Sequence, residues 1–133
     1  MLLTDTGPLV AILDESDEAH GRCAAVLKRT APPLTTTWPV VTEAMYLLAS
    51  LRAQDALLAM IERGTLSVAP IETGDVPRIR ALMRKFRDLP MDLADATLVR
   101  VAEREGIRRL FTLDRRDFSV YRAGRGRSFS IIP

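Results

Sequence analysis

The hydrophobic pattern of the first third of the chain changes from a short apolar run to helical spacing and back. Met1–Thr4 predicts a short buried strand that ends on Asp5, and the Gly-Pro pair at positions 7 and 8 predicts a turn that opens a helix. Apolar positions three and four residues apart then predict a helix over 17–29. Two prolines end that helix, and Leu34–Thr37 is expected to form the second strand.

Helical spacing dominates the middle of the chain. Apolar residues from Val40 to Ile61 fall on one side of a helical segment, which Gly64 is suited to end. Leu66–Ile71 predicts a third strand. A further helix is expected from Thr73 onward, until a proline closes it at position 90.

The last third continues the alternation. Asp92–Glu105 keeps its apolar residues in helical register and has Gly106 as a cap. Leu110–Leu113 and Ser128–Ile132 predict two more strands, the first of which leads into Asp114. Because strands alternate with helices along the whole chain, we expect a single-domain α/β/α sandwich with a mostly parallel central sheet.

Length and composition agree with one soluble globular domain covering residues 1–133. The chain is 47% hydrophobic and 27% charged, which is ordinary for such a domain. Its uncharged apolar runs fall short of the roughly 20 residues that cross a bilayer, and Asp5 lies where the apolar region of a secretory signal would begin. We expect a cytoplasmic protein without membrane contact.

The residue inventory excludes several chemistries. Cys23 is the only cysteine and His20 the only histidine, so an internal disulfide, a His pair and a Cys/His zinc cluster are all impossible. A Ser-His-Asp triad lacks a nucleophile motif near His20. Any catalysis must therefore depend on carboxylates.

Charge is distributed unevenly around a net value of +2. The first half of the chain is net acidic and the second half net basic, and nearly all of the basic residues are arginine. The planar guanidinium suits paired contacts with phosphate, but a GC-rich genome that favours arginine codons explains the same bias. Arginine content alone does not decide the function.

Acidic residues occupy the positions where a parallel sheet places its ligand site. Asp5 and Asp114 follow strands, Asp92 and Asp95 share the first turn of a helix, and Glu43 lies near the start of another helix. In open parallel sheets the site lies beyond the carboxyl ends of the strands, where the strand order reverses. Several elements can therefore bring acids to one place.

Each acid alone also has a structural explanation, as a helix cap, a first-turn residue or a turn former. Together they are harder to explain, because two like charges about 4 Å apart repel by roughly 4 kcal/mol at an effective dielectric near 20. Either their pKa values rise or a cation joins them. Oxygen ligands alone select a hard ion such as Mg²⁺ or Mn²⁺, which typically activates water and orients a phosphodiester.

Four motifs around these acids resemble the acidic quartet of PIN-domain nucleases. They are Asp5-Thr6 after an apolar strand, Glu43 in Thr-Glu-Ala-Met-Tyr, Asp95 in Asp-Leu-Ala-Asp-Ala-Thr-Leu, and Asp114 in Phe-Thr-Leu-Asp-Arg-Arg-Asp-Phe. Their order and spacing are most similar to the VapC-type toxins of bacterial toxin-antitoxin pairs. The resemblance covers nearly the whole chain, although Gly7 stands where many members have a serine or another small residue.

The resemblance implies a PIN-like fold and a Mg²⁺- or Mn²⁺-dependent endoribonuclease that is usually dimeric and is inhibited by a small antitoxin protein inserted into the active-site groove. By matching position, it implies that the catalytic residues are Asp5, Glu43, Asp95 and Asp114. Of these, Asp5, Asp95 and Asp114 are the expected metal ligands. Supporting roles fall to Thr6, Asp92, Thr112 and Asp117.

Two further expectations concern partners. Arg115 and Arg116 directly follow Asp114, so we expect them at the rim of the acidic pocket, guiding the RNA backbone; solvated turn residues, or a pair with Asp117, are the alternative. The segment from Val40 to Ile61 has more apolar residues than one helix face can bury, which favours a homodimer over two helices packed only on each other.

Other classes of protein fit less well. Asp5-Thr6-Gly7 also matches the triplet of aspartic proteases, but that fold is almost entirely β and needs a second triplet. A receiver-type phosphorylation domain needs a lysine at a late strand end, and neither Lys28 nor Lys85 is suitably placed. The remaining alternatives are a PIN-like RNA-binding or protein-interaction module without catalysis, and a PIN nuclease of RNA processing without an antitoxin.

Overall fold

The computed structural model describes residues 1–122 and 126–133, and its centre is a five-stranded parallel sheet. The strand order is β3-β2-β1-β4-β5, and each neighbouring pair is parallel. The mostly parallel sheet expected from the sequence is therefore confirmed. The strands are β1 (Leu2–Thr4), β2 (Leu34–Thr36), β3 (Leu66–Val68), β4 (Arg109–Phe111) and β5 (Ser130–Ile132).

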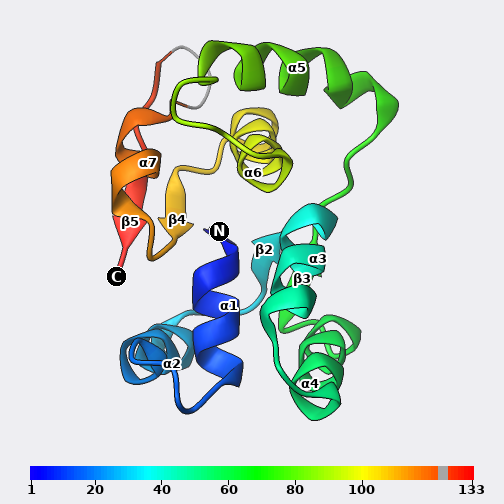
Figure 1. Cartoon of the computed structure of the whole chain (residues 1–133), viewed down its shortest axis with the longest axis vertical. Helices are drawn as coiled ribbons and strands as arrows, with labels where there is room; N and C mark the ends of the chain where they lie inside the picture. The colour runs from blue at the N-terminus through cyan, green and yellow to red at the C-terminus, as the bar shows by residue number, and fades with distance from the viewer. Residues whose placement is uncertain (123–125) are drawn as a thin grey trace.

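Helices surround this sheet (Figure 1). Helix α1 packs on α2 and α3, while α6 packs on α3 and α5. A short 3-10 turn over Thr73–Asp75 leads into α5. The helices are α1 (Thr6–Leu13), α2 (His20–Arg29), α3 (Trp38–Leu47), α4 (Leu51–Glu62), α5 (Val76–Lys85), α6 (Leu93–Glu105) and α7 (Arg115–Val120).

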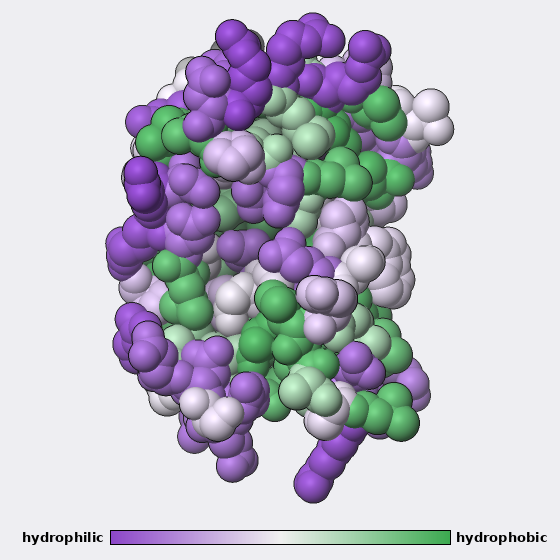
Figure 2. Space-filling view, in the orientation of Figure 1, coloured by the Kyte–Doolittle hydropathy of each residue, from purple (hydrophilic) through white to green (hydrophobic). Residues whose placement is uncertain are grey.

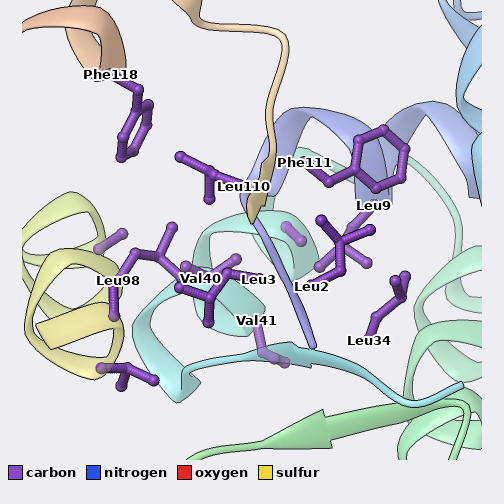
Figure 3. Packing of buried hydrophobic residues seen from close by; sticks show 14 of the residues in the cluster. Leu2, Leu3, Leu9, Leu34, Val40, Val41, Leu98, Leu110, Phe111 and Phe118 are labelled. Carbon is purple, nitrogen blue, oxygen red and sulfur yellow. The ribbon is translucent and has the colours of Figure 1, made fainter. Parts of the chain in front are cut away.

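The core lies on both faces of the sheet. Successive residues of a strand point to opposite faces, and both Leu2 and Leu3 of β1 are buried. Figure 3 shows Leu2 beside Leu9 of α1, and Leu3 on the other side with Val40 and Leu98 of α3 and α6. Helices therefore cover the sheet from two sides, as expected for a sandwich.

Strand order reverses at β1, which has β2 on one side and β4 on the other. The chain proceeds outward from β1 through β2 to β3, and returns to the opposite side for β4 and β5. The carboxyl ends of β1 and β4 thus flank the point where a doubly wound sheet opens its binding crevice. Asp5 and Thr112 directly follow these two strands.

Several bounds differ from the sequence-based expectation, such as the helix expected over 17–29, which begins at His20, and three differences change an element. The helical segment from Val40 to Ile61 is divided into α3 and α4, because Ser50 caps a new helix by accepting the N–H of Ala53. The strand expected over Leu66–Ile71 already ends at Val68. Residues 115–120, for which we expected no helix, form α7.

Across the described residues, none of the helices combines the length and the apolar character that a bilayer crossing requires.

Candidate active site

A pocket of about 810 Å³ opens at the reversal point of the sheet. It is bordered by residues from the end of β1, from α3, from the start of α6 and from the segment after β4. Its acidic lining residues are Asp5, Glu43, Asp88, Asp92, Asp95, Asp114 and Asp117. The structure thus brings together the four acids of the expected quartet, and also both of the extra acids that the sequence suggested.

Asp5 is held between β1 and β4. Its N–H donates to the carbonyl of Phe111 at 2.9 Å, which continues the parallel ladder one residue past the strand. Its Oδ2 accepts a hydrogen bond from Oγ1 of Thr112 at 2.9 Å. Burial raises the pKa of Asp5, and the charges of Asp114 and Asp92 raise it further, against the lowering effect of its hydrogen bonds.

Asp114 begins α7 as its N-cap. Its Oδ1 accepts the N–H of Asp117 at 3.1 Å, and its own N–H donates to Oγ1 of Thr112 at 3.0 Å. The cap therefore fixes the carboxylate of Asp114 beside the residue that also binds Asp5. Partial burial and the neighbouring charge of Asp114 raise the pKa of Asp117.

Asp92 and Asp95 form the first turn of α6 in the same way. Oδ1 of Asp92 accepts the N–H of Asp95 at 2.8 Å, which makes Asp92 the N-cap. Burial is the main cause that raises the pKa of Asp95 to about 8, and the charges of Asp92, Asp5 and Asp114 add to it. Asp92 can cap α6 and still line the pocket together with Asp95, because the helix starts at the pocket wall.

Glu43 reaches the pocket from α3. Burial raises its pKa, and so do the charges of Asp92 and Asp5, while the nearby hydroxyl of Thr6 lowers it. Thr6 lies beside it at the start of α1, and its Oγ1 is buried without a hydrogen-bond partner in the described part of the chain. A buried hydroxyl without a partner costs free energy, so the pocket wall carries one polar group that a ligand can satisfy.

The electrostatics of the pocket favour a cation. Four carboxylates of the pocket, those of Asp5, Glu43, Asp95 and Asp117, have pKa values raised by burial and by the charges of neighbouring acids, chiefly Asp92 and Asp114. An oxygen-only donor set with this surplus of negative charge fits Mg²⁺ or Mn²⁺. Within residues 1–122 and 126–133, no group of three or more His, Cys, Asp or Glu side chains is placed to hold an ion as it stands. To bind one ion together, the carboxylates of the pocket must therefore move closer to one another than they are in this structure.

The two arginines expected at the rim differ in position. Arg116 lines the pocket, whereas Arg115 is absent from its lining residues and donates to the backbone carbonyl of Pro133 at the end of β5. Both side chains are exposed. The structure therefore places one of them at the acidic site.

Exposed apolar residues remain on α4 after folding. Leu57 and Met60 are buried, but Leu51 is 81% exposed and Leu58 44% exposed. Figure 2 shows apolar side chains at several places on the visible face, including its lower centre, and polar side chains along the top edge, where α5 lies. Packing of the two helices within one chain thus accounts for only part of the apolar surplus between Val40 and Ile61.

Tyr121 is a pocket neighbour that the sequence reasoning missed. It is fully buried at the end of α7, and its hydroxyl donates to Oδ2 of Asp95 at 3.4 Å. Burial and the charge of Asp95 raise the pKa of Tyr121, which keeps it a hydrogen-bond donor. The sequence signal is limited to a capping residue type at Asp114 and to Phe118 and Tyr121 three residues apart, which is too little for periodicity to identify a helix of six residues.

Comparisons with known proteins agree with this architecture. A family model described as PIN domain matches residues 2–124. The chain is 30% identical over 135 residues to Ribonuclease VapC26 of Mycobacterium tuberculosis (strain ATCC 25618 / H37Rv), a match that covers 99% of this chain and 100% of that protein.

A solved structure shows the same fold. It is the crystal structure of Mycobacterium tuberculosis VapC20, described as a sarcin-ricin loop cleaving toxin. The superposition has a TM-score of 0.80 at 19% sequence identity and covers 87% of this chain and 92% of that chain. The parallel α/β sandwich with its helices is therefore shared between the two.

Proposed function

We propose that this chain, which belongs to the PIN-domain family and is homologous to the VapC toxins, is an endoribonuclease that hydrolyses RNA phosphodiester bonds with the help of Mg²⁺ or Mn²⁺. RNA is the substrate class because VapC26 is named a ribonuclease and VapC20 is described as cleaving the sarcin-ricin loop. We propose that the chain acts in the cytoplasm as the toxin of a toxin-antitoxin pair.

One observation carries the proposal. Acids from four separate parts of the chain line one pocket at the reversal point of the sheet, and burial and mutual repulsion raise the pKa values of several of them. Such an arrangement is costly for the folded chain in isolation. A divalent cation supplies the compensation that the fold does not, and it also offsets the repulsion between these acids and the phosphodiester of the substrate.

Asp5, Asp95 and Asp114 are the proposed ligands, since their carboxylates approach from β1, α6 and the start of α7. A divalent ion held there polarises the phosphate and makes water a better nucleophile. Thr112 positions Asp5 through its hydrogen bond, and the N–H of Asp117 positions Asp114. Asp92 fixes the first turn of α6, from which Asp95 projects.

Glu43 has a different proposed role. Its raised pKa suits a group that takes a proton from the attacking water and releases it later, because a base works best when its pKa approaches the working pH. Oγ1 of Thr6 lies close enough to lower the pKa of Glu43 but makes no well-formed hydrogen bond within the described residues, so it is available to a phosphate oxygen or to the water itself. In this assignment Glu43 takes the proton from the attacking water, and Thr6 orients that water or the phosphate oxygen.

The test is cleavage of a long RNA of mixed sequence, with new ends mapped by primer extension, in Mg²⁺, in Mn²⁺ and in excess EDTA. We expect cuts at defined sites with either ion and none with EDTA. Glu43→Gln is expected to lower the cleavage rate by about 10²–10⁴-fold, which is the usual contribution of a positioned acid or base.

Asp88→Asn is the matched control for that substitution. Asp88 lines the same pocket and is exposed, and we assign it no role in metal binding or proton transfer. Its substitution changes the charge of the pocket by the same amount as Glu43→Gln. Equal rates for both variants would contradict the role of Glu43, and cleavage that persists in EDTA would contradict the metal dependence.

An interaction module without catalysis, and a nuclease of RNA processing without an antitoxin, are the competing functions. The cleavage assay decides the first. For the second, the neighbouring reading frame is tested for a small protein that co-purifies with this chain and abolishes cleavage when added back. Failure of such a protein to inhibit would remove the toxin-antitoxin assignment and leave the nuclease.

We also propose a homodimer that uses α4. Leu51 and Leu58 leave apolar surface uncovered in one copy of the chain. Light scattering at tens of micromolar should give twice the monomer mass, and Leu51→Glu should give the monomer without loss of the fold, because that side chain is 81% exposed. A monomer mass for the wild-type chain would overturn the dimer.

A further inference from the structure

The three proposed metal ligands share one structural feature: each carboxylate accepts a hydrogen bond from a group on another residue. Asp5 accepts from Oγ1 of Thr112, and Asp114 accepts from the N–H of Asp117. Asp95 accepts from the hydroxyl of Tyr121, its one side-chain hydrogen bond among the described residues. Carboxylates that bind metals are usually oriented in this way by neighbouring donors.

Tyr121 is held more firmly than an ordinary side chain. It is 0% exposed. Phe86, at the end of α5, meets its ring edge to face with centroids 5.1 Å apart, and Phe118 of α7 does the same at 5.2 Å. Two edge-to-face contacts of this kind leave an aromatic ring little freedom of orientation. The position of the hydroxyl is therefore determined by the aromatic packing.

The contact also joins two elements that carry acids. Tyr121 caps the end of α7, where its N–H donates to the carbonyl of Asp117, and Asp114 begins the same helix. Asp95 belongs to α6, a different helix that lines the same pocket. The hydroxyl thus ties the direction of the Asp95 carboxylate to the helix that positions Asp114.

From this geometry we propose that Tyr121 is a positioning residue of the metal site, which acts through Asp95 by fixing the orientation of its carboxylate. The inference rests on the proposed function, because it assigns Asp95 as a ligand. It adds a residue outside the acidic quartet and its threonine neighbours. Tyr121 touches neither the ion nor the RNA in this assignment.

The test compares Tyr121→Phe with Tyr46→Phe. The first substitution removes one oxygen and keeps the ring between Phe86 and Phe118, so the fold is expected to persist. Tyr46 is the chain's other tyrosine and is 87% exposed, so its variant is the control for loss of a hydroxyl. Mn²⁺ binding is measured by calorimetry on the RNA-free chain, and kcat and KM are measured on a mapped RNA cleavage site.

For Tyr121→Phe we expect the Kd for Mn²⁺ to rise about 10-fold or more, as for other groups that orient metal ligands. At fixed, subsaturating Mn²⁺ the kcat should fall while the KM for RNA stays within about twofold. Raising the Mn²⁺ concentration should restore most of the rate. Tyr46→Phe should match the wild-type chain in all of these measurements.

Three outcomes overturn the inference. If Tyr121→Phe binds Mn²⁺ as Tyr46→Phe does, the hydroxyl does not position a ligand. If the thermal midpoint in EDTA falls while Mn²⁺ affinity is unchanged, Tyr121 serves packing alone. If the wild-type chain neither binds Mn²⁺ nor cleaves RNA, both the proposed function and this inference are wrong. If the wild-type chain is active and Tyr121→Phe behaves like it, only this inference is wrong.

Discussion

Thr112 donates a hydrogen bond from Oγ1 to Oδ2 of Asp5 at 2.9 Å, although the two residues are 107 positions apart in the sequence. They follow β4 and β1, which are neighbours in the sheet. The same Oγ1 accepts the N–H of Asp114 at 3.0 Å, and Thr112 is 1% exposed. One buried hydroxyl therefore holds two of the proposed ligands in register.

Thr112→Val should lower both stability and metal affinity. Valine keeps the shape but leaves the N–H of Asp114 and the carboxylate of Asp5 without this partner, at a cost of about 1–3 kcal/mol in the free energy of unfolding. The Kd for Mn²⁺ should rise about 10-fold or more. Urea unfolding and calorimetry measure the two effects.

Thr42→Val is the control for that change. Thr42 is exposed on α3, and its hydroxyl donates to the carbonyl of Trp38 within the same helix. Its loss should change the free energy of unfolding by no more than about 0.5 kcal/mol. If the two valine variants have the same free energy of unfolding and the same Kd for Mn²⁺, the hydroxyl of Thr112 does not position Asp5 or Asp114.

Sequence patterns predicted the sheet and the meeting of the acids because both depend on local signals. A run such as Leu2–Thr4 has to be a buried strand, and an acid directly after it has to lie at the carboxyl edge of the sheet. Asp114 follows a predicted strand in the same way, and Asp95 lies in the first turn of a predicted helix, which usually starts at the same edge of the sheet. The positions of these residues required no knowledge of the remaining side chains.

Helix α7 and the contact made by Tyr121 were beyond such reasoning. A helix of six residues is too short for periodicity to identify, and its stability comes from the Asp114 cap and from packing of Phe118 and Tyr121 in the core. The different directions of Arg115 and Arg116 follow from that helix. Tertiary packing, which the sequence does not display locally, decided each of these features.

The metal-free chain should lose stability as pH rises, through Asp95. Its pKa is about 8 in the folded chain against 3.8 as the ordinary value, so between these limits the folded state binds more protons than the unfolded state. The contribution of this group is fully present below about pH 4 and is lost as pH rises through about 8.

Asp95→Asn should remove that contribution while abolishing metal-dependent cleavage. The difference in unfolding midpoint between variant and wild type, measured in EDTA, should therefore grow in favour of the variant from pH 5 to pH 8. Comparing the two chains cancels the opposing titration of other carboxyls. A difference that stays constant over this range would contradict the raised pKa of Asp95.

Asp75 should contribute to stability and not to cleavage. It is 5% exposed and accepts hydrogen bonds from Arg100 at 2.7 Å and from Arg104 at 3.0 Å, which fastens the start of α5 to α6. A backbone hydrogen bond from Glu72 and these arginines lower the pKa of Asp75 to about 2. Its stabilising effect is thus present above about pH 4 and is lost as pH falls towards 2.

Asp75→Asn should cost about 1.5–3 kcal/mol in the free energy of unfolding at neutral pH, the usual value of a charge-assisted hydrogen bond. The cost should shrink towards pH 2. Cleavage at a temperature where the variant is folded should equal that of the wild-type chain, because Asp75 does not line the acidic pocket. Reduced cleavage by fully folded Asp75→Asn would mean that the α5–α6 connection reaches the site.

Arg116 should guide the RNA backbone to the pocket. It lines the pocket together with the acids, whose summed charge repels phosphate at long range. A cationic side chain at the rim offsets that field and releases counterions when it meets a phosphate. Arg115 is expected to contribute less, because it donates to the carbonyl of Pro133 and lies outside the pocket lining.

Arg116→Ala should therefore weaken RNA binding and lower the slope of log affinity against log salt by about one, with Mn²⁺ affinity unchanged. Fluorescence anisotropy at several salt concentrations, with the catalytically inactive Asp95→Asn background to prevent cleavage, gives both values. Arg80→Ala is the control, since Arg80 is exposed on α5 and does not line the pocket. If Arg116→Ala retains the wild-type affinity and salt slope, the backbone enters by another route, and Arg122, Arg127 and Arg125, the last of which lies outside the described residues, become the residues to replace next.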